Sequence, residues 1–134
     1  YIIIIIYYYY TVVYTTYMST ELGSYLRARR EALKSENKAF SLRQVAQRIE
    51  VEPSYLSKVE RGREVPSEPK IQRLADELGL NRDVLLALAG KVSADLQLVI
   101  RKRPELFAQV IRDLARLPDH AVLRVVREVR DGGW

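Results

Sequence analysis

A short segment in the middle of the chain carries the residues that are best suited to recognise another molecule. The segment Gln47 to Gly62 reads "QRIEVEPSYLSKVERG". Pro53 suits the first turn of a helix and Gly62 the position just past its end, so a short helix is predicted between them. At about 100° per residue, one face of this helix holds a polar set with Tyr55 beside it: Ser54, Ser57, Lys58 and Arg61.

This polar face has the chemistry of a DNA-reading surface. The major groove of B-DNA is about 12 Å wide and admits one helix. Lys58 can reach guanine O6 and N7, the two serines can hydrogen-bond to bases or phosphates, and Arg61 can meet the backbone. The plainer alternative is a solvated face on a small helical protein, because Ser and Lys are common on any surface.

Composition argues against catalysis and against a metal or cofactor. The chain has no cysteine and one histidine, His120, and it contains no glycine-rich phosphate loop or paired-carboxylate motif. We therefore predict no catalytic residue, no metal site and no cofactor. The 22 Lys and Arg against 17 Asp and Glu give a formal charge of +5, which leans toward an anionic partner. The absence of cysteine fits a cytoplasmic protein.

Residues 1–17 differ from the rest, because they are all Tyr, Ile, Thr or Val. They lack the basic start and cleavage site of a signal peptide, and their load of Tyr and Thr is unlike a membrane span, so no membrane partner is predicted. These residues are strand formers, and the leader is expected to be disordered or extended. Met18 looks like the natural start, which indicates a non-native leader; the alternative is a native self-association strand.

The remaining chain predicts an all-α protein. Ser41 and Gln44 form a capping box that opens a helix over 42–49, after a first helix from Thr20 to Leu33. Further helices are expected over 53–61, 67–78 and from 81 to just before 90, and after Ser93, Pro104 and Pro118. This pattern divides the chain into a five-helix domain, 18–90, and a helical extension, 91–134.

The segment from Leu22 to about Leu88 resembles the Cro and lambda-repressor-like helix-turn-helix domains, often called the XRE family. The resemblance is carried in order by "LGSYLRARRE", "SLRQVAQRI", "PSYLSKVERG", "PKIQRLADELGL" and "DVLLALAG". It implies a five-helix fold whose third helix lies in the major groove. By position it implies base reading by Ser54, Ser57 and Lys58, and backbone or flanking contacts by Gln44, Tyr55 and Arg61.

The resemblance also implies a buried ion pair between Arg30 and Glu60. The helical pattern puts Glu60 on the inner side of its helix, where a carboxylate needs a partner; the alternative is that both residues are exposed and unpaired.

Two features of the sequence depart from the family pattern. Glu50 occupies a corner where the family usually has a left-handed glycine, at a cost of about 1 kcal/mol unless the corner bends differently. The connection "KSENKAF" is longer, and its Lys34 and Lys38 are candidates for phosphate contacts.

These features predict a sequence-specific DNA-binding transcriptional regulator, specifically a repressor. The alternatives are an autoregulating antitoxin whose residues 91–134 bind a toxin protein, and a scaffold that binds no DNA. One short helix reads few base pairs, so a homodimer on a palindromic operator is expected. Apolar stripes in the extension either form that dimer or fold back on the first five helices: Phe107, Val110, Ile111, Leu114, Val122, Leu123, Val126 and Val129.

Overall fold

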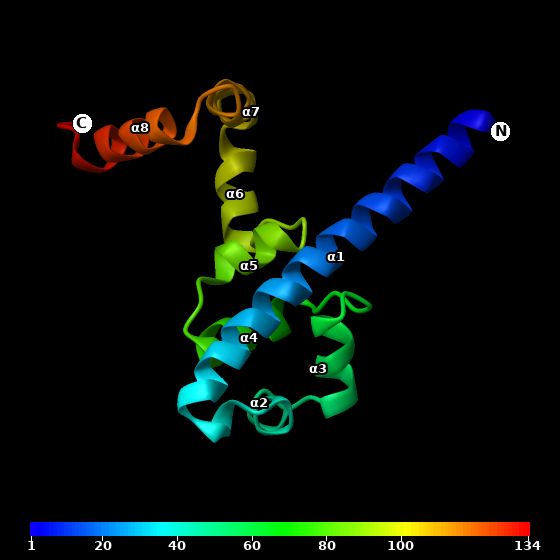
Figure 1. Cartoon of the computed structure of the whole chain (residues 1–134). Helices are drawn as coiled ribbons and strands as arrows, with labels where there is room; N and C mark the ends of the chain where they lie inside the picture. Colours follow the sequence, from blue (N-terminus) through cyan, green and yellow to red (C-terminus); the bar gives the residue numbers. More distant parts are fainter. The chain divides into compact units, whose positions relative to one another are not determined.

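The computed structural model describes all 134 residues and contains helices but no strand (Figure 1). It therefore confirms the all-α prediction. The chain divides into two compact units, Tyr1–Ser93 and Ala94–Trp134, so the division falls slightly beyond the predicted boundary at residue 90. The elements are α1 (Ile2–Glu36), the 3-10 helix η1 (Lys38–Phe40), α2 (Leu42–Arg48), α3 (Pro53–Glu60), α4 (Glu68–Leu78), α5 (Arg82–Leu88), α6 (Ala94–Lys102), α7 (Pro104–Leu114) and α8 (Asp119–Asp131).

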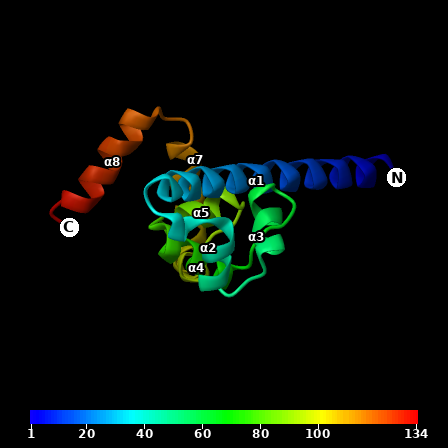
Figure 2. The same cartoon turned by 60° about the horizontal axis from the view of Figure 1, so that its bottom comes forward.

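The first unit is built around the second half of α1. This part of α1 packs against η1, α3, α4 and α5, and Figure 2 shows the shorter helices gathered along one side of it. One apolar core joins all five α-helices, and each fully buried Leu, Ile or Val in it contributes about 1.5–3 kcal/mol. The core residues are Leu22, Leu26, Val45, Ala46, Ile49, Leu56, Val59, Ile71, Leu74, Ala75, Leu78, Leu85 and Leu86.

The leader is helical, so the expectation of an extended or disordered segment is wrong. Residues 2–17 continue α1 without a break, and almost all of their side chains are exposed. A helix satisfies its own backbone hydrogen bonds, whereas a lone strand would leave them unpaired, and this outweighs the strand propensity of Ile, Tyr and Thr. By length and composition alone, α1 is apolar enough to cross a membrane, which is weak evidence because core helices and signal sequences pass the same test.

The second unit has three helices but no buried side chain of its own. Helix α6 packs against α7, and apolar side chains of all three helices lie exposed, among them Leu98, Ile111 and Val129. Ser93, just before α6, has a buried hydroxyl group without a hydrogen-bond partner, so its side chain does not cap that helix. A unit of this size rarely folds stably without a core, and its apolar faces therefore need a covering surface.

A glycine lets α1 approach the end of α3 closely. A Cβ at Gly23 would lie 2.5 Å from the carbonyl oxygen of Val59 and 2.6 Å from that of Glu60. One turn earlier, Ser19 Oγ donates a hydrogen bond to the carbonyl oxygen of Gly62 over 2.8 Å. The crossing is therefore a backbone-to-backbone contact, and the sequence alone did not single out Gly23.

We expect Gly23→Ala to lower the free energy of unfolding by about 1–3 kcal/mol, because the new methyl group would force α1 and α3 apart. The matched control is Gly133→Ala, since a Cβ at Gly133 meets nothing within 4 Å. Urea denaturation of both variants measures the difference. Equal stabilities would show that the two helices separate freely at this point.

Candidate nucleic-acid interface

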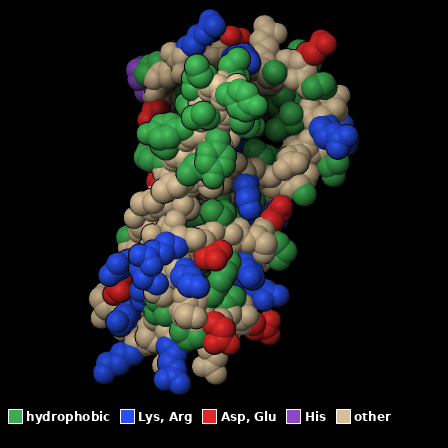
Figure 3. Space-filling model, turned by 90° about the vertical axis from the view of Figure 1, so that its right-hand side faces the viewer, with side chains coloured by type: hydrophobic (Ala, Val, Ile, Leu, Met, Phe, Trp, Pro, Cys, Tyr) green, Lys and Arg blue, Asp and Glu red, His purple; other side chains and the backbone are tan.

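Helix α3 has the two faces that the sequence pattern predicts. Leu56, Val59 and Glu60 are buried against the first unit. On the opposite side, Ser54, Lys58 and Arg61 are exposed and Ser57 is half-buried. Figure 3 shows the side of the molecule on which α3 lies, and Lys and Arg side chains, with some Asp and Glu among them, are gathered in the lower half of that view. The polar face is thus open to a large anionic ligand.

The side chains on and beside this face differ in the contacts that they make within the protein. The side chain of Lys58 makes no hydrogen bond or ion pair, so its ammonium group is available to a ligand. Arg61 Nε donates to the carbonyl oxygen of Ser57 over 3.3 Å, which holds its side chain along the helix. Tyr55 is half-buried, and Lys70 Nζ of α4 lies 4.3 Å from the centre of its ring. This cation–π contact fixes the ring at the edge of the face.

The other predicted contact residues lie around the connection between α1 and α2. Lys34 is in the last turn of α1, Lys38 is in η1, and Gln44 is in the first turn of α2. All three are exposed. They do not belong to the outer face of α3, so the structure separates the predicted residues into two groups.

A buried ion pair fixes α3 to α1. Arg30 Nε lies 2.5 Å from Glu60 Oε1, and Arg30 Nη2 lies 3.0 Å from Glu60 Oε2. Both side chains are about 95% buried, at 4% and 5% exposure. Arg30 Nη1 also donates to the carbonyl oxygen of Phe40 over 3.3 Å, which ties in η1. The hydrogen bonds that Arg30 donates to Glu60 raise the pKa of its guanidinium group above the ordinary value, although burial opposes this, so Arg30 stays charged.

The corner between α2 and α3 is left-handed even though it holds no glycine. Glu50 has a φ of 60°, and the next residue, Val51, donates its N–H to the carbonyl oxygen of Ala46 over 2.9 Å. This is the backbone shape that the resemblance implied for a glycine. Arg73 Nη1 of α4 lies 3.3 Å from Glu50 Oε2, so the carboxylate is paired.

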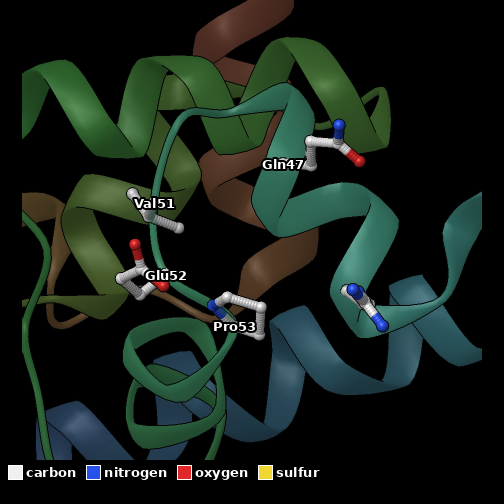
Figure 4. Close-up of a pocket in the computed structure, with 5 residues that line it drawn as sticks. Gln47, Val51, Glu52 and Pro53 are labelled. Carbon is white, nitrogen blue, oxygen red and sulfur yellow. The ribbon is translucent and has the colours of Figure 1, made fainter.

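A shallow hollow lies beside the start of α3 and contains polar residues that the sequence reasoning missed (Figure 4). It is lined by Arg43 and Gln47 of α2 and by Val51, Glu52 and Pro53 at the beginning of α3. Arg43 and Gln47 are exposed, and their i, i+4 spacing in "LRQVAQR" was the available signal for a shared face. No group of three or more His, Cys, Asp or Glu side chains is placed to hold a metal ion.

We expect Glu60→Ala to lower the free energy of unfolding by about 3–5 kcal/mol, because it would leave the charge of Arg30 buried and unpaired. The matched control is Glu31→Ala, which removes an exposed partner of the same guanidinium and should cost less than about 1 kcal/mol. Chemical denaturation provides both values. Similar losses for the two variants would mean that burial of the Glu60 pair does not matter.

Known proteins resemble the first unit in particular. A protein-family model described as a helix-turn-helix domain matches residues 21–88. An uncharacterized HTH-type transcriptional regulator of Mycobacterium tuberculosis, found in strains CDC 1551 and H37Rv, is 38% identical over 68 residues. That match covers 51% of this chain and 45% of the relative, so the chain spans less than half the length of the curated relatives it matches.

Two crystal structures of the clp gene regulator ClgR from Corynebacterium glutamicum are also similar. One is 32% identical, with 55% of this chain and 88% of that chain covered and a TM-score of 0.43. The other is 28% identical, with 70% and 89% covered and a TM-score of 0.44. The family match spans half of the chain and contains every element from η1 to α5. The chain belongs to the helix-turn-helix domain family.

Proposed function

We propose that this protein is a sequence-specific DNA-binding transcriptional repressor of the Cro and lambda-repressor-like type, which reads the major groove with α3. The observation that carries the proposal is the outer face of α3, where Lys58 is exposed and unpaired while the inner face is anchored in the core. The related mycobacterial proteins bear the name of HTH-type transcriptional regulators. In this proposal the protein acts on DNA in the cytoplasm.

The residues take two kinds of role in this proposal. Ser54, Ser57 and Lys58 read base edges, since they lie on the outward face of α3. The backbone and flanking contacts come from a second set, which positions the domain without selecting sequence: Gln44, Tyr55, Arg61, Lys34 and Lys38. Arg43 joins this second set because it lies beside the start of α3.

We expect Lys58→Ala to cost about 1–3 kcal/mol in binding to a duplex selected from a random pool, and to relax preference at one base position. Arg61→Ala should instead weaken all duplexes alike, because phosphates carry no sequence information. Competition binding against a panel of single-base variants separates the two effects.

The matched control is Lys102→Ala, which removes the same charge from an exposed position on α6, outside the helix-turn-helix unit. It should leave the base preference unchanged. If Lys58→Ala binds the selected duplex as tightly as the control does, α3 does not read the groove through Lys58.

The second unit supplies a dimer interface in this proposal. Its apolar faces are exposed, as at Leu106, Ile111, Leu123 and Val126. An antiparallel pair of α8 helices, one from each copy, would bury the apolar side chains of the two copies against each other, which suits a twofold dimer on a palindromic operator.

A second candidate function rests on the same apolar faces. An antitoxin would use α7 and α8 to bind a toxin protein and would use α3 to regulate its own gene. The oligomeric state separates the two proposals, because a surface reserved for a toxin leaves the isolated chain monomeric, whereas the dimer forms without any other protein.

We expect Val126→Glu to convert a dimer at micromolar concentration into a monomer and to weaken binding to a palindromic duplex more than tenfold, because it puts a charge in the apolar interface. Arg124→Glu is the control on the opposite side of α8. Sedimentation velocity and a binding titration measure both. A wild-type chain that sediments as a monomer at this concentration would contradict the dimer and favour the partner protein.

A further inference from the structure

The corner before α3 shares its backbone pattern with the ends of three other helices. At the ends of α2, α3, α4 and α5, a residue with positive φ is followed by an N–H that bonds back to the fifth preceding carbonyl oxygen. These are Schellman-type helix ends. The positive-φ residue is a glycine at α3, α4 and α5, namely Gly62, Gly79 and Gly90, whereas at α2 it is Glu50. Only the corner that sets the direction of α3 carries this backbone strain.

One arginine of α4 contacts this corner at two points. Arg73 Nη1 donates to the carbonyl oxygen of Ile49 over 3.2 Å and lies 3.3 Å from Glu50 Oε2. Ile49 is the last residue of the α2 end, where unpaired carbonyl groups concentrate negative charge. The guanidinium therefore satisfies a backbone acceptor and neutralises a carboxylate at the same time.

These contacts matter because α2 packs mainly against η1 and α3. From α4, side-chain contacts reach the end of α2: Arg73 at the corner, and Glu77, which pairs with Arg48. The Arg73 contact involves the strained residue itself, whereas Arg48 lies two residues before it. Loss of Arg73 would remove the side-chain contacts that oppose the strain at Glu50 and would leave the corner to backbone hydrogen bonds such as that from Val51 to Ala46.

We propose that Arg73 is a positioning residue for DNA reading, which holds the α2–α3 corner in the shape that glycine adopts freely and cancels the charge that Glu50 would present to DNA. The inference rests on the proposed DNA-binding function, since it concerns the direction of α3. The predicted effect of Arg73 on folding stability does not depend on DNA binding, because the strain at Glu50 and its contact with Arg73 exist without DNA.

A double-mutant cycle of Arg73→Ala and Glu50→Gly tests the inference. In the native Glu50 background, Arg73→Ala should lower the folding equilibrium constant about tenfold, because a hydrogen bond from a charged group and an ion pair are both lost. In the Glu50→Gly background the same change should cost about threefold, because only the bond to Ile49 remains to be lost. Equal costs in both backgrounds would overturn the proposal. Arg27→Ala is the control, as Arg27 is exposed on α1 without an ion pair.

The DNA measurement is made at a temperature where circular dichroism shows every variant fully folded. Arg73→Ala should weaken binding to the selected duplex about tenfold and to a scrambled duplex less, and adding Glu50→Gly should restore most of the difference. If the loss is equal for both duplexes, the salt slope falls by about one and Glu50→Gly restores nothing, then Arg73 contacts phosphate directly and the positioning role is wrong.

The unfolding measurements and the DNA-binding measurements test the role of Arg73 and the proposed function separately. A wild-type chain that binds no duplex removes the proposed function, and with it the positioning role in DNA reading. In that case, unequal costs of Arg73→Ala in the Glu50 and Glu50→Gly backgrounds would still show that Arg73 stabilises the α2–α3 corner. If the wild-type chain binds DNA but Arg73→Ala costs the same in both backgrounds, the role of Arg73 at the corner is wrong and the proposed function stands.

Discussion

The buried ion pair between Arg30 and Glu60 is the contact on which the arrangement of the first unit depends. Burying either charge alone would cost several kcal/mol, so each side chain is stable in the core only beside the other. The pair joins α1 to α3, and a further hydrogen bond from Arg30 includes η1. Because Glu60 is on the inner face of α3, this pairing decides which residues of α3 point outward. The polar face follows from a constraint in the core.

Close backbone contacts make that arrangement rigid. Gly23 allows α1 to touch the last carbonyl groups of α3, and Ser19 binds the carbonyl group of Gly62 just beyond it. At the other end of α3, the corner at Glu50 is held from α4 by Arg73. Helix α3 is therefore fixed at both ends by different helices, which suits a surface that has to match the spacing of base edges.

Local signals in the sequence were enough to predict the first unit from α2 to α5, because Ser41, Pro53, Gly62 and Gly79 mark helix ends through short-range backbone chemistry. The inward position of Glu60 was also readable, since it follows from helical periodicity. Gly23 and Arg73 were not, because their roles depend on backbone groups that are distant in sequence. The leader was misjudged because strand propensity has effect only where a neighbouring strand exists. The arrangement of the second unit was unpredictable for a related reason, since none of its apolar faces is buried within it.

In the proposed function, the first unit presents α3 to the major groove of a specific DNA sequence. The most direct test is a titration of the full chain against a duplex selected from a random pool and against its scrambled counterpart, each at several salt concentrations. We expect the selected duplex to bind at least about a thousandfold more tightly, and the logarithm of the binding constant to fall linearly with the logarithm of the salt concentration for both duplexes. Equal affinity for the two duplexes, or binding that does not respond to salt, would contradict the proposed function.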